Sequence, residues 1–184
     1  GFTHVAQLYS CMSSVTRRNA YRYAGAIEAA YMIDGRNVEI IADGIHLRKS
    51  LLQYGCKFKA PHTIALCTDS MRAAGMPDGE YMLGSNDNGQ RVIVEDGVAK
   101  LPDRSAFAGS VATADRLVRT MMEVAEVSLH DAIKMMTQNP ARILGVDKKK
   151  GSLEIGKDAD IIIFDSKISV QTTIVNGKII YAKN

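Results

Sequence analysis

The amino-acid sequence predicts an α/β fold that forms part of a β/α barrel. Two apolar runs, residues 38–45 and 63–67, each end abruptly in polar residues and are separated by a segment of helical length. Such runs are typical of buried parallel strands, and in β/α barrels the carboxyl ends of the strands carry the chemistry. His46 and Asp69 follow the two runs, one strand-plus-helix unit apart. We therefore expect both side chains at one active site.

Each of these two residues also has a purely structural interpretation. An aspartate after Thr68 is often only a helix N-cap, and a lone histidine is more often a structural residue than a catalyst. Taken singly, His46 and Asp69 would be assigned those roles. Their corresponding positions in successive units favour a shared site instead.

The length of the chain limits how much of a barrel it can form. A complete β/α barrel takes about 250 residues, and this chain has 184. It begins at Gly1 without a methionine, and residues 2–5 resemble the inside of a strand. We expect the C-terminal part of a longer polypeptide, with residues 1–145 in a partial barrel that forms the catalytic domain and residues 146–184 in a small β domain.

Composition excludes several classes of partner. The 23 Lys and Arg residues nearly balance the 20 Asp and Glu residues, which excludes a nucleic-acid footprint but leaves room for a small anionic ligand. No stretch approaches the ~20 apolar residues of a membrane span. Cys11, Cys56 and Cys67 are an odd number without paired spacing, which predicts reduced thiols and a cytoplasmic protein.

Hydrophobic periodicity predicts the elements of the first half in order. Small and aromatic residues at helical spacing predict a helix over residues 17–31, and a shorter helix follows the first apolar run over residues 48–54. Residues 71–110 depart from this rhythm. There, Asp96-Gly97 between residues 91–95 and 98–101 predicts a β-hairpin, and we expect this excursion to carry substrate-facing loops.

Two helices are predicted next, over residues 112–125 and 128–144. The second begins at Ser128, with Asp131 completing a near capping box, and ends at Gly145. We expect His130 to be solvated surface. The predicted packing stripe of this helix comprises Ala132, Ile133, Met136, Ile143 and Leu144.

The C-terminal residues change to short strands. Strands are predicted over residues 161–164, 169–175 and 178–181, with a turn at Asn176-Gly177. A sheet of so few strands is only marginally stable by itself. We therefore expect these strands to complete a sheet that begins upstream in the sequence. Residues 148–150, three lysines, are predicted to be a solvated turn rather than a binding patch.

Two segments near the C-terminus carry a family resemblance. Residues 139–145 read Asn-Pro-Ala-Arg-Ile-Leu-Gly, residues 150–160 read Lys-Gly-Ser-Leu-Glu-Ile-Gly-Lys-Asp-Ala-Asp, and an apolar strand follows. This pattern resembles the C-terminal signature of the amidohydrolase superfamily, whose metal-dependent members combine a (β/α)8 barrel with a small β-sandwich. A narrower resemblance is to the N-acetylglucosamine-6-phosphate deacetylase family. Its motifs are Leu8-Tyr9-x-x-Met12, Tyr23-Ala24-Gly25, Ile41-Ala42-Asp43-Gly44-Ile45-His46, Thr68-Asp69, Ala73-Ala74-Gly75 with Asp78-Gly79, and Ala108-Gly109-Ser110.

The resemblance implies metal-assisted hydrolysis of an acetamide, which releases acetate and glucosamine 6-phosphate. Asp69 matches the catalytic aspartate of the family, which moves a proton from water to the leaving amine. His46 matches the substrate-binding histidine. The resemblance further implies a sugar-pocket loop at Ala108-Gly109-Ser110 and phosphate contacts at Ser10 and Cys11.

Arg18 matches the phosphate-binding arginine of the family. The family offers this arginine to the active site of the neighbouring subunit, so the resemblance implies a homodimer. From the residues alone, Arg17, Arg18 and Arg22 are better explained as a solvated basic helix start.

The chain departs from the family at one metal ligand. The family motif reads Thr-His-Leu-Tyr-Asn-Ala-Met, whereas residues 6–12 read Ala-Gln-Leu-Tyr-Ser-Cys-Met, so Gln7 stands at the ligand histidine. A neutral amide is a poor substitute for imidazole at a zinc or iron site. His4 cannot replace it, because an offset of three along a strand points to the other face. We expect weak binding of the divalent metal, with its remaining ligands upstream.

We therefore predict a deacetylase acting on N-acetylglucosamine 6-phosphate, inactive as this chain alone. Two alternatives stay open. One is an amidohydrolase acting on a related sugar phosphate or cyclic amide. The other is a catalytically silent paralogue that binds a sugar phosphate, for which Gln7 is the motivating residue.

Overall fold

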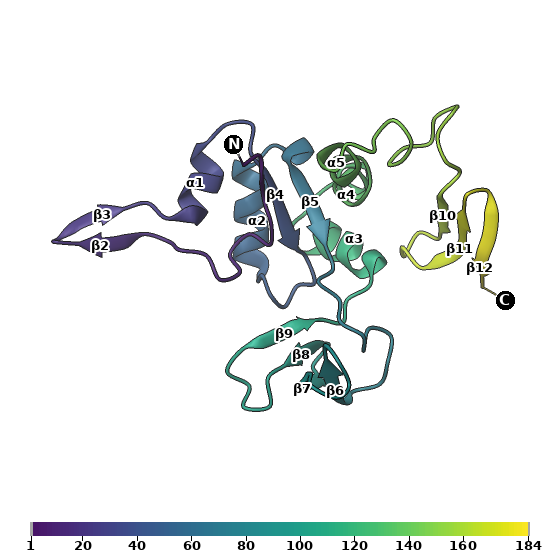
Figure 1. Cartoon of the computed structure of the whole chain (residues 1–184). Helices are drawn as coiled ribbons and strands as arrows, with labels where there is room; N and C mark the ends of the chain where they lie inside the picture. The colour runs from purple at the N-terminus through teal and green to yellow at the C-terminus, as the bar shows by residue number, and fades with distance from the viewer. Residues whose placement is uncertain (1, 184) are drawn as a thin grey trace.

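The centre of the molecule is a three-stranded parallel sheet. The computed structural model describes residues 2–183; Gly1 and Asn184, at the outer ends of the two expected domains, lie outside the described residues. The sheet has the order β1 (His4–Val5), β4 (Asn37–Ile41) and β5 (Ile64–Cys67) (Figure 1). Val38, Ile40 and Ile64 have no exposed surface. Their burial explains why the sequence of these strands is apolar without alternation.

Helices flank this sheet on both sides. Helices α1 (Ala26–Met32) and α2 (Lys49–Phe58) lie toward one side, and α3 (Ala114–Glu123), α4 (Leu129–Met136) and α5 (Gln138–Ile143) lie beside β5 (Figure 1). A single-turn helix, Pro61–Thr63, leads into β5. One apolar core joins the sheet to both groups of helices. Its largest fully buried side chains are Leu8, Ile40, Leu52, Ile64, Leu117, Met121 and Met135.

The helix expected over residues 17–31 is wrong in its first half. Those residues form an exposed hairpin of β2 (Thr16–Arg18) and β3 (Tyr21–Tyr23), which extends away from the sheet (Figure 1). Asn19 and Ala20 take left-handed φ values of 46° and 69°, a two-residue turn that reverses the chain. The arginines there belong to strands, not to a basic helix start. Helix α1 begins only at Ala26.

The other predicted helices differ in their ends. Helix α2 runs to Phe58, beyond the expected residue 54. The helix expected over residues 128–144 divides at Thr137, because Pro140 has no N–H to donate and its ring clashes with the carbonyl four residues earlier. Leu144, expected in the packing stripe, is 74% exposed, and Met135 is buried instead. His130 is exposed, as predicted.

Residues 71–110 form a second, antiparallel sheet. Its order is β6 (Gly79–Leu83), β7 (Gln90–Glu95), β8 (Val98–Lys100) and β9 (Phe107–Ser110). The predicted hairpin is confirmed, since Glu95 pairs with Val98 across Asp96 and Gly97, both left-handed. This sheet lies past the carboxyl ends of β4 and β5 and has its own small core (Figure 1).

The C-terminal residues form a third sheet, in agreement with the predicted strands. It comprises β10 (Ile161–Phe164), β11 (Val170–Val175) and β12 (Lys178–Ala182) (Figure 1). Ile168, at the β10–β11 turn, is buried in the main core, and its carbonyl accepts a hydrogen bond from Arg119. The three lysines at 148–150 are exposed, as expected, although Lys150 forms ion pairs with Asp158 and Asp160. No helix within residues 2–183 is both long enough and apolar enough to cross a membrane.

Candidate active site

Gln7 and Asp69 meet at the carboxyl ends of β1 and β5. Nε2 of Gln7 donates a hydrogen bond of 3.0 Å to Oδ1 of Asp69, although 62 residues separate them. The backbone N–H of Gln7 donates to Oε1 of Glu39 on β4, at 3.2 Å. Gln7 and Asp69 have left-handed φ values of 47° and 49°, which turn the chain as the strands end. Two predicted site residues are thus in direct contact.

Residues 108–110 lie against the backbone of Asp69. The N–H of Ser110 donates to the Asp69 carbonyl at 2.8 Å, and the N–H of Met71 donates to the Ser110 carbonyl at 2.9 Å. Gly109 has a φ of 85°, and a Cβ there would lie 3.2 Å from the Asp69 carbonyl oxygen. Glycine is therefore required at this point of closest approach.

His46 is held by a buried aspartate. Nδ1 of His46 lies 2.7 Å from Oδ2 of Asp43, whose side chain has no exposed surface. Burial alone would raise the pKa of Asp43, but hydrogen bonds from the His46 ring and from the N–H groups of Ile45 and His46 outweigh it, so that the pKa of Asp43 is lowered. The ring of Phe107 on β9 packs against the imidazole, with centroids 4.8 Å apart.

Arg116 on α3 connects the end of β4 to the antiparallel sheet. Its Nη2 donates to the Asp43 carbonyl at 2.9 Å, and its Nη1 donates to the Gly97 carbonyl in the β7–β8 turn at 3.0 Å. Sequence reasoning missed Asp43, Phe107 and Arg116 as site residues. Only Asp43 had a detectable signal, because an aspartate three residues before a histidine can bond the intervening backbone in an Asx-turn.

The residues expected to contact the phosphate lie in two separate parts of the chain. Ser10 and Cys11 lie in the turn after β1, where the N–H of Ser10 donates to the Gln7 carbonyl and Cys11 is exposed. Arg18 lies on the β2–β3 hairpin, which projects from the molecule (Figure 1). Its guanidinium is 5.6 Å from the centroid of the Tyr23 ring. Within this chain, Arg18 is not brought to Asp69.

The described residues do not by themselves fit a metal ion. Residues 2–183 contain no group of three or more His, Cys, Asp or Glu side chains placed to hold one. Gln7, at the expected ligand position, directs its amide N–H toward Asp69. The nearby His4 faces Glu39, with 3.8 Å between Nε2 and Oε2. A metal would need ligands from outside these residues.

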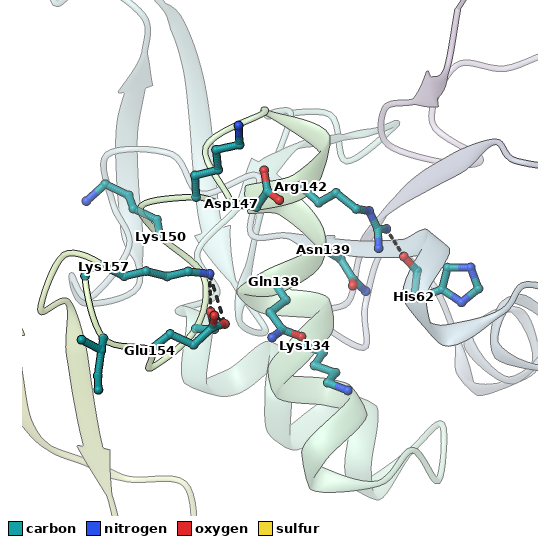
Figure 2. Close-up of a pocket in the computed structure, with 13 residues that line it drawn as sticks. His62, Lys134, Gln138, Asn139, Arg142, Asp147, Lys150, Glu154 and Lys157 are labelled. Atoms are coloured by element: carbon teal, nitrogen blue, oxygen red, sulfur yellow. Dashed lines mark hydrogen bonds and ion pairs between the residues drawn. The ribbon is translucent and has the colours of Figure 1, made fainter.

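A groove of about 640 Å³ lies elsewhere, between α4, α5 and the loop that precedes β10 (Figure 2). Its charged lining is partly paired, because Lys157 contacts Glu154 and Arg142 donates to the His62 carbonyl. The groove shares no lining residue with the strand-end site. Gln7, Gly109 and Ser110 lie against Asp69, and none of the predicted site residues lines this groove.

Known proteins with similar sequences and structures are deacetylases of hexosamine 6-phosphates. The chain is 36% identical to an N-acetylglucosamine-6-phosphate deacetylase of Bacillus subtilis over 181 residues, which cover 98% of the chain and 43% of that protein. It is also 36% identical to an N-acetylgalactosamine-6-phosphate deacetylase of Escherichia coli O157:H7, over 94% of the chain and 44% of that protein. The crystal structure of the Pasteurella multocida N-acetylglucosamine-6-phosphate deacetylase matches with a TM-score of 0.86 and 26% identity, over 98% of the chain and 45% of that structure.

The chain thus spans less than half the length of these relatives. The sequence model of the amidohydrolase family matches residues 23–180, most of the chain. The chain therefore belongs to the amidohydrolase family.

Proposed function

We propose that the whole protein hydrolyses the acetamide of N-acetylglucosamine 6-phosphate to glucosamine 6-phosphate and acetate. The observation that carries this proposal is the Asp69 carboxylate, oriented by Gln7 at the strand ends and backed by residues 108–110. The similarity to deacetylases of hexosamine 6-phosphates over nearly the whole chain supports the same reaction.

Asp69 is the proton carrier of the proposed reaction. Oδ1 takes the hydrogen bond from Gln7, which sets the plane of the carboxylate. Asp69 removes a proton from the water that attacks the acetyl carbonyl and then gives a proton to the departing amine, so one group serves as base and acid. Its partial burial limits competition from bulk solvent. The second carboxylate oxygen is the natural site for this proton, because Oδ1 is already occupied.

The remaining predicted residues bind the substrate. His46 contacts the sugar phosphate, and Ala108, Gly109 and Ser110 line the sugar pocket. Ser10 and Cys11 contribute weaker phosphate contacts. Arg18, far from Asp69 within its own chain, serves the active site of a second copy in a homodimer, which gives the projecting β2–β3 hairpin a role (Figure 1).

The proposed reaction places this chain within a larger cytoplasmic enzyme. The parallel order of β1, β4 and β5 supports part of a (β/α)8 barrel over residues 1–145, and the third sheet supports a share of a small β-sandwich over residues 146–184. A divalent zinc or iron ion would need ligands from outside the described residues, and its chemistry would be polarisation of the acetyl carbonyl. The chain alone is then inactive.

Two alternative functions are each favoured by one observation. The Escherichia coli relative is named for the galactosamine epimer, which favours N-acetylgalactosamine 6-phosphate as a second candidate substrate. Gln7 at the expected ligand position favours a silent sugar-phosphate-binding protein. Acetate release by the whole protein from both epimers, and from unphosphorylated N-acetylglucosamine, distinguishes these functions. Release from neither phosphorylated sugar, with binding retained, would contradict the proposed reaction.

A further inference from the structure

We infer that Asp43 is a positioning residue that fixes the tautomer of His46, so that Nε2 is the nitrogen presented to the substrate. This inference deepens the proposed function, because it assigns the proton arrangement of the substrate-binding histidine. Asp43 itself makes no contact with substrate in this scheme; it acts through His46.

The orientation of the Asp43 carboxylate is set by the backbone. Its Oδ1 accepts hydrogen bonds from the N–H groups of Ile45 and His46, at 2.9 and 2.8 Å. Oδ2 then points to Nδ1 of the His46 ring, 2.7 Å away. The carboxylate is thus preorganised by two amides before it meets the imidazole.

The charge state of Asp43 determines where the shared proton lies. An ionised carboxylate can only accept, so the proton between the two groups belongs to Nδ1 of His46. In the neutral ring Nε2 is then an acceptor, and in the protonated ring it becomes a donor to a substrate oxygen. An acceptor at Nε2 suits a hydroxyl group of the sugar as ligand, and a proton forced onto Nε2 removes this acceptor.

Further contacts hold the imidazole and its partner in place. The Phe107 ring packs against the imidazole at 4.8 Å, and only 12% of the His46 side chain is exposed. Arg116 bonds the Asp43 carbonyl and so anchors the backbone on which the carboxylate is mounted. Since Nδ1 is occupied, the exposed part of the ring leaves Nε2 for a ligand.

A purely structural role for Asp43 makes different predictions. Its two backbone hydrogen bonds close an Asx-turn between β4 and α2, and this turn alone could account for the burial of Asp43. Asp43→Asn separates the two roles. The amide oxygen can still accept from the Ile45 and His46 N–H groups, while the amide N–H₂ donates to Nδ1 and forces the proton to Nε2.

The test combines kinetics and spectroscopy on the whole protein. We expect Asp43→Asn to lower kcat/KM for N-acetylglucosamine 6-phosphate about 10–100-fold, as for other residues that orient a ligating histidine. In a His46→Ala background the same change should have no further effect, because Asp43 acts only through His46. Asp147→Asn, at an exposed position in the loop after α5, is the matched control and should leave kinetics unchanged.

Histidine ¹⁵N NMR provides a readout that does not depend on activity. His46, assigned by its loss in His46→Ala, should show a protonated Nδ1 in the unaltered protein and a protonated Nε2 in Asp43→Asn. A protonated Nε2 in the unaltered neutral ring would overturn the inference, even if Asp43→Asn failed to fold. Equal losses from Asp43→Asn with and without His46 would also overturn it. Absence of deacetylation with the expected spectra would instead contradict only the proposed function.

Discussion

The side-chain amide of Gln7 donates a 3.0 Å hydrogen bond to the carboxylate of Asp69, across the end of the strand that lies between them. The contact joins the residue at an expected metal-ligand position to the expected proton carrier. It orients the Asp69 carboxylate without neutralising its charge, because the Gln7 amide donates a hydrogen bond but carries no charge of its own.

Asp69→Asn should abolish turnover by the whole protein while sugar-phosphate binding persists. A positioned acid-base group contributes roughly 10²–10⁴-fold, and its effect lies mainly in the transition state. The asparagine oxygen can keep the hydrogen bond from Gln7, and asparagine tolerates the left-handed φ of 49° at this position. Acetate release and calorimetric binding of N-acetylglucosamine 6-phosphate measure the two effects. Near-normal turnover would contradict the role assigned to Asp69.

Gln7→His should raise both the metal content and the deacetylation rate of the whole protein. Imidazole donates more charge to a divalent transition metal than an amide does, and the substitution also frees Oδ1 of Asp69. Metal titration with acetate release followed in parallel measures both. Gln7→Ala frees Asp69 without adding a ligand and is the matched control. Unchanged metal affinity and rate in Gln7→His would show that this position does not limit metal binding.

Arg18→Ala should weaken the binding of N-acetylglucosamine 6-phosphate about ten- to a hundredfold more than the binding of unphosphorylated N-acetylglucosamine. This ratio corresponds to a charge-assisted hydrogen bond of roughly 1.5–3 kcal/mol. Arg22→Ala, on the neighbouring strand of the same exposed hairpin, is the control. KM values for the two sugars provide the comparison. Equal losses for both sugars would assign Arg18 a role in folding rather than phosphate recognition.

Asn139→Ala should lower the free energy of unfolding by about 2–4 kcal/mol, because two acceptors lose their donor. Asn139 is 3% exposed, and its Nδ2 donates to the carbonyls of Pro61 and Ile64 at 2.9 and 2.7 Å. These bonds tie α5 to the start of β5. Urea unfolding measures the loss, and Gln138→Ala, at the exposed neighbouring position, should change stability little. Equal stability of the two variants would contradict the prediction.

Asp43 should make the free energy of unfolding depend on pH in the acidic range. Its hydrogen bonds lower the native pKa below the ordinary value of 3.8, so the unfolded chain binds the proton at a higher pH than the native protein does. The stabilisation is therefore complete above about pH 4 and is lost as the pH falls through the native pKa. Asp43→Asn should flatten the fall in unfolding free energy between about pH 4 and 2, measured by denaturant titration at several pH values. An unchanged slope would show that Asp43 is not responsible.

The elements that the sequence predicted well have strong local signals. The strands before His46 and Asp69 are continuous apolar runs, and Asp96-Gly97 has few alternatives to a tight hairpin turn. The first half of the segment 17–31 was misassigned because the spacing of its aromatic residues fits a helix. The turn instead requires left-handed backbone conformations at Asn19 and Ala20, and Asn-Ala is not a typical sequence for such a turn.

The candidate site was predictable only in part, for a similar reason. His46 and Asp69 stand at strand ends, which a pattern of apolar runs can locate, whereas Gln7 was identified through the family resemblance. Phe107 and Arg116 reach the site through contacts distant in sequence, one from β9 and one from α3. No local pattern encodes such contacts, because they depend on how the antiparallel sheet docks against the parallel one.

The hydrogen bonds between Asp69, Met71 and Ser110 make residues 71–109 an insertion whose two ends are clamped together. Because both ends are anchored beside Asp69, the proposed proton carrier, the length and sequence of the far loops, such as residues 84–89, can change without moving it. Under the proposed function, exchange of residues 71–109 can therefore change the substrate preference while Asp69 stays in place. In protein engineering, the same clamp makes residues 71–109 a natural cassette for loop grafting.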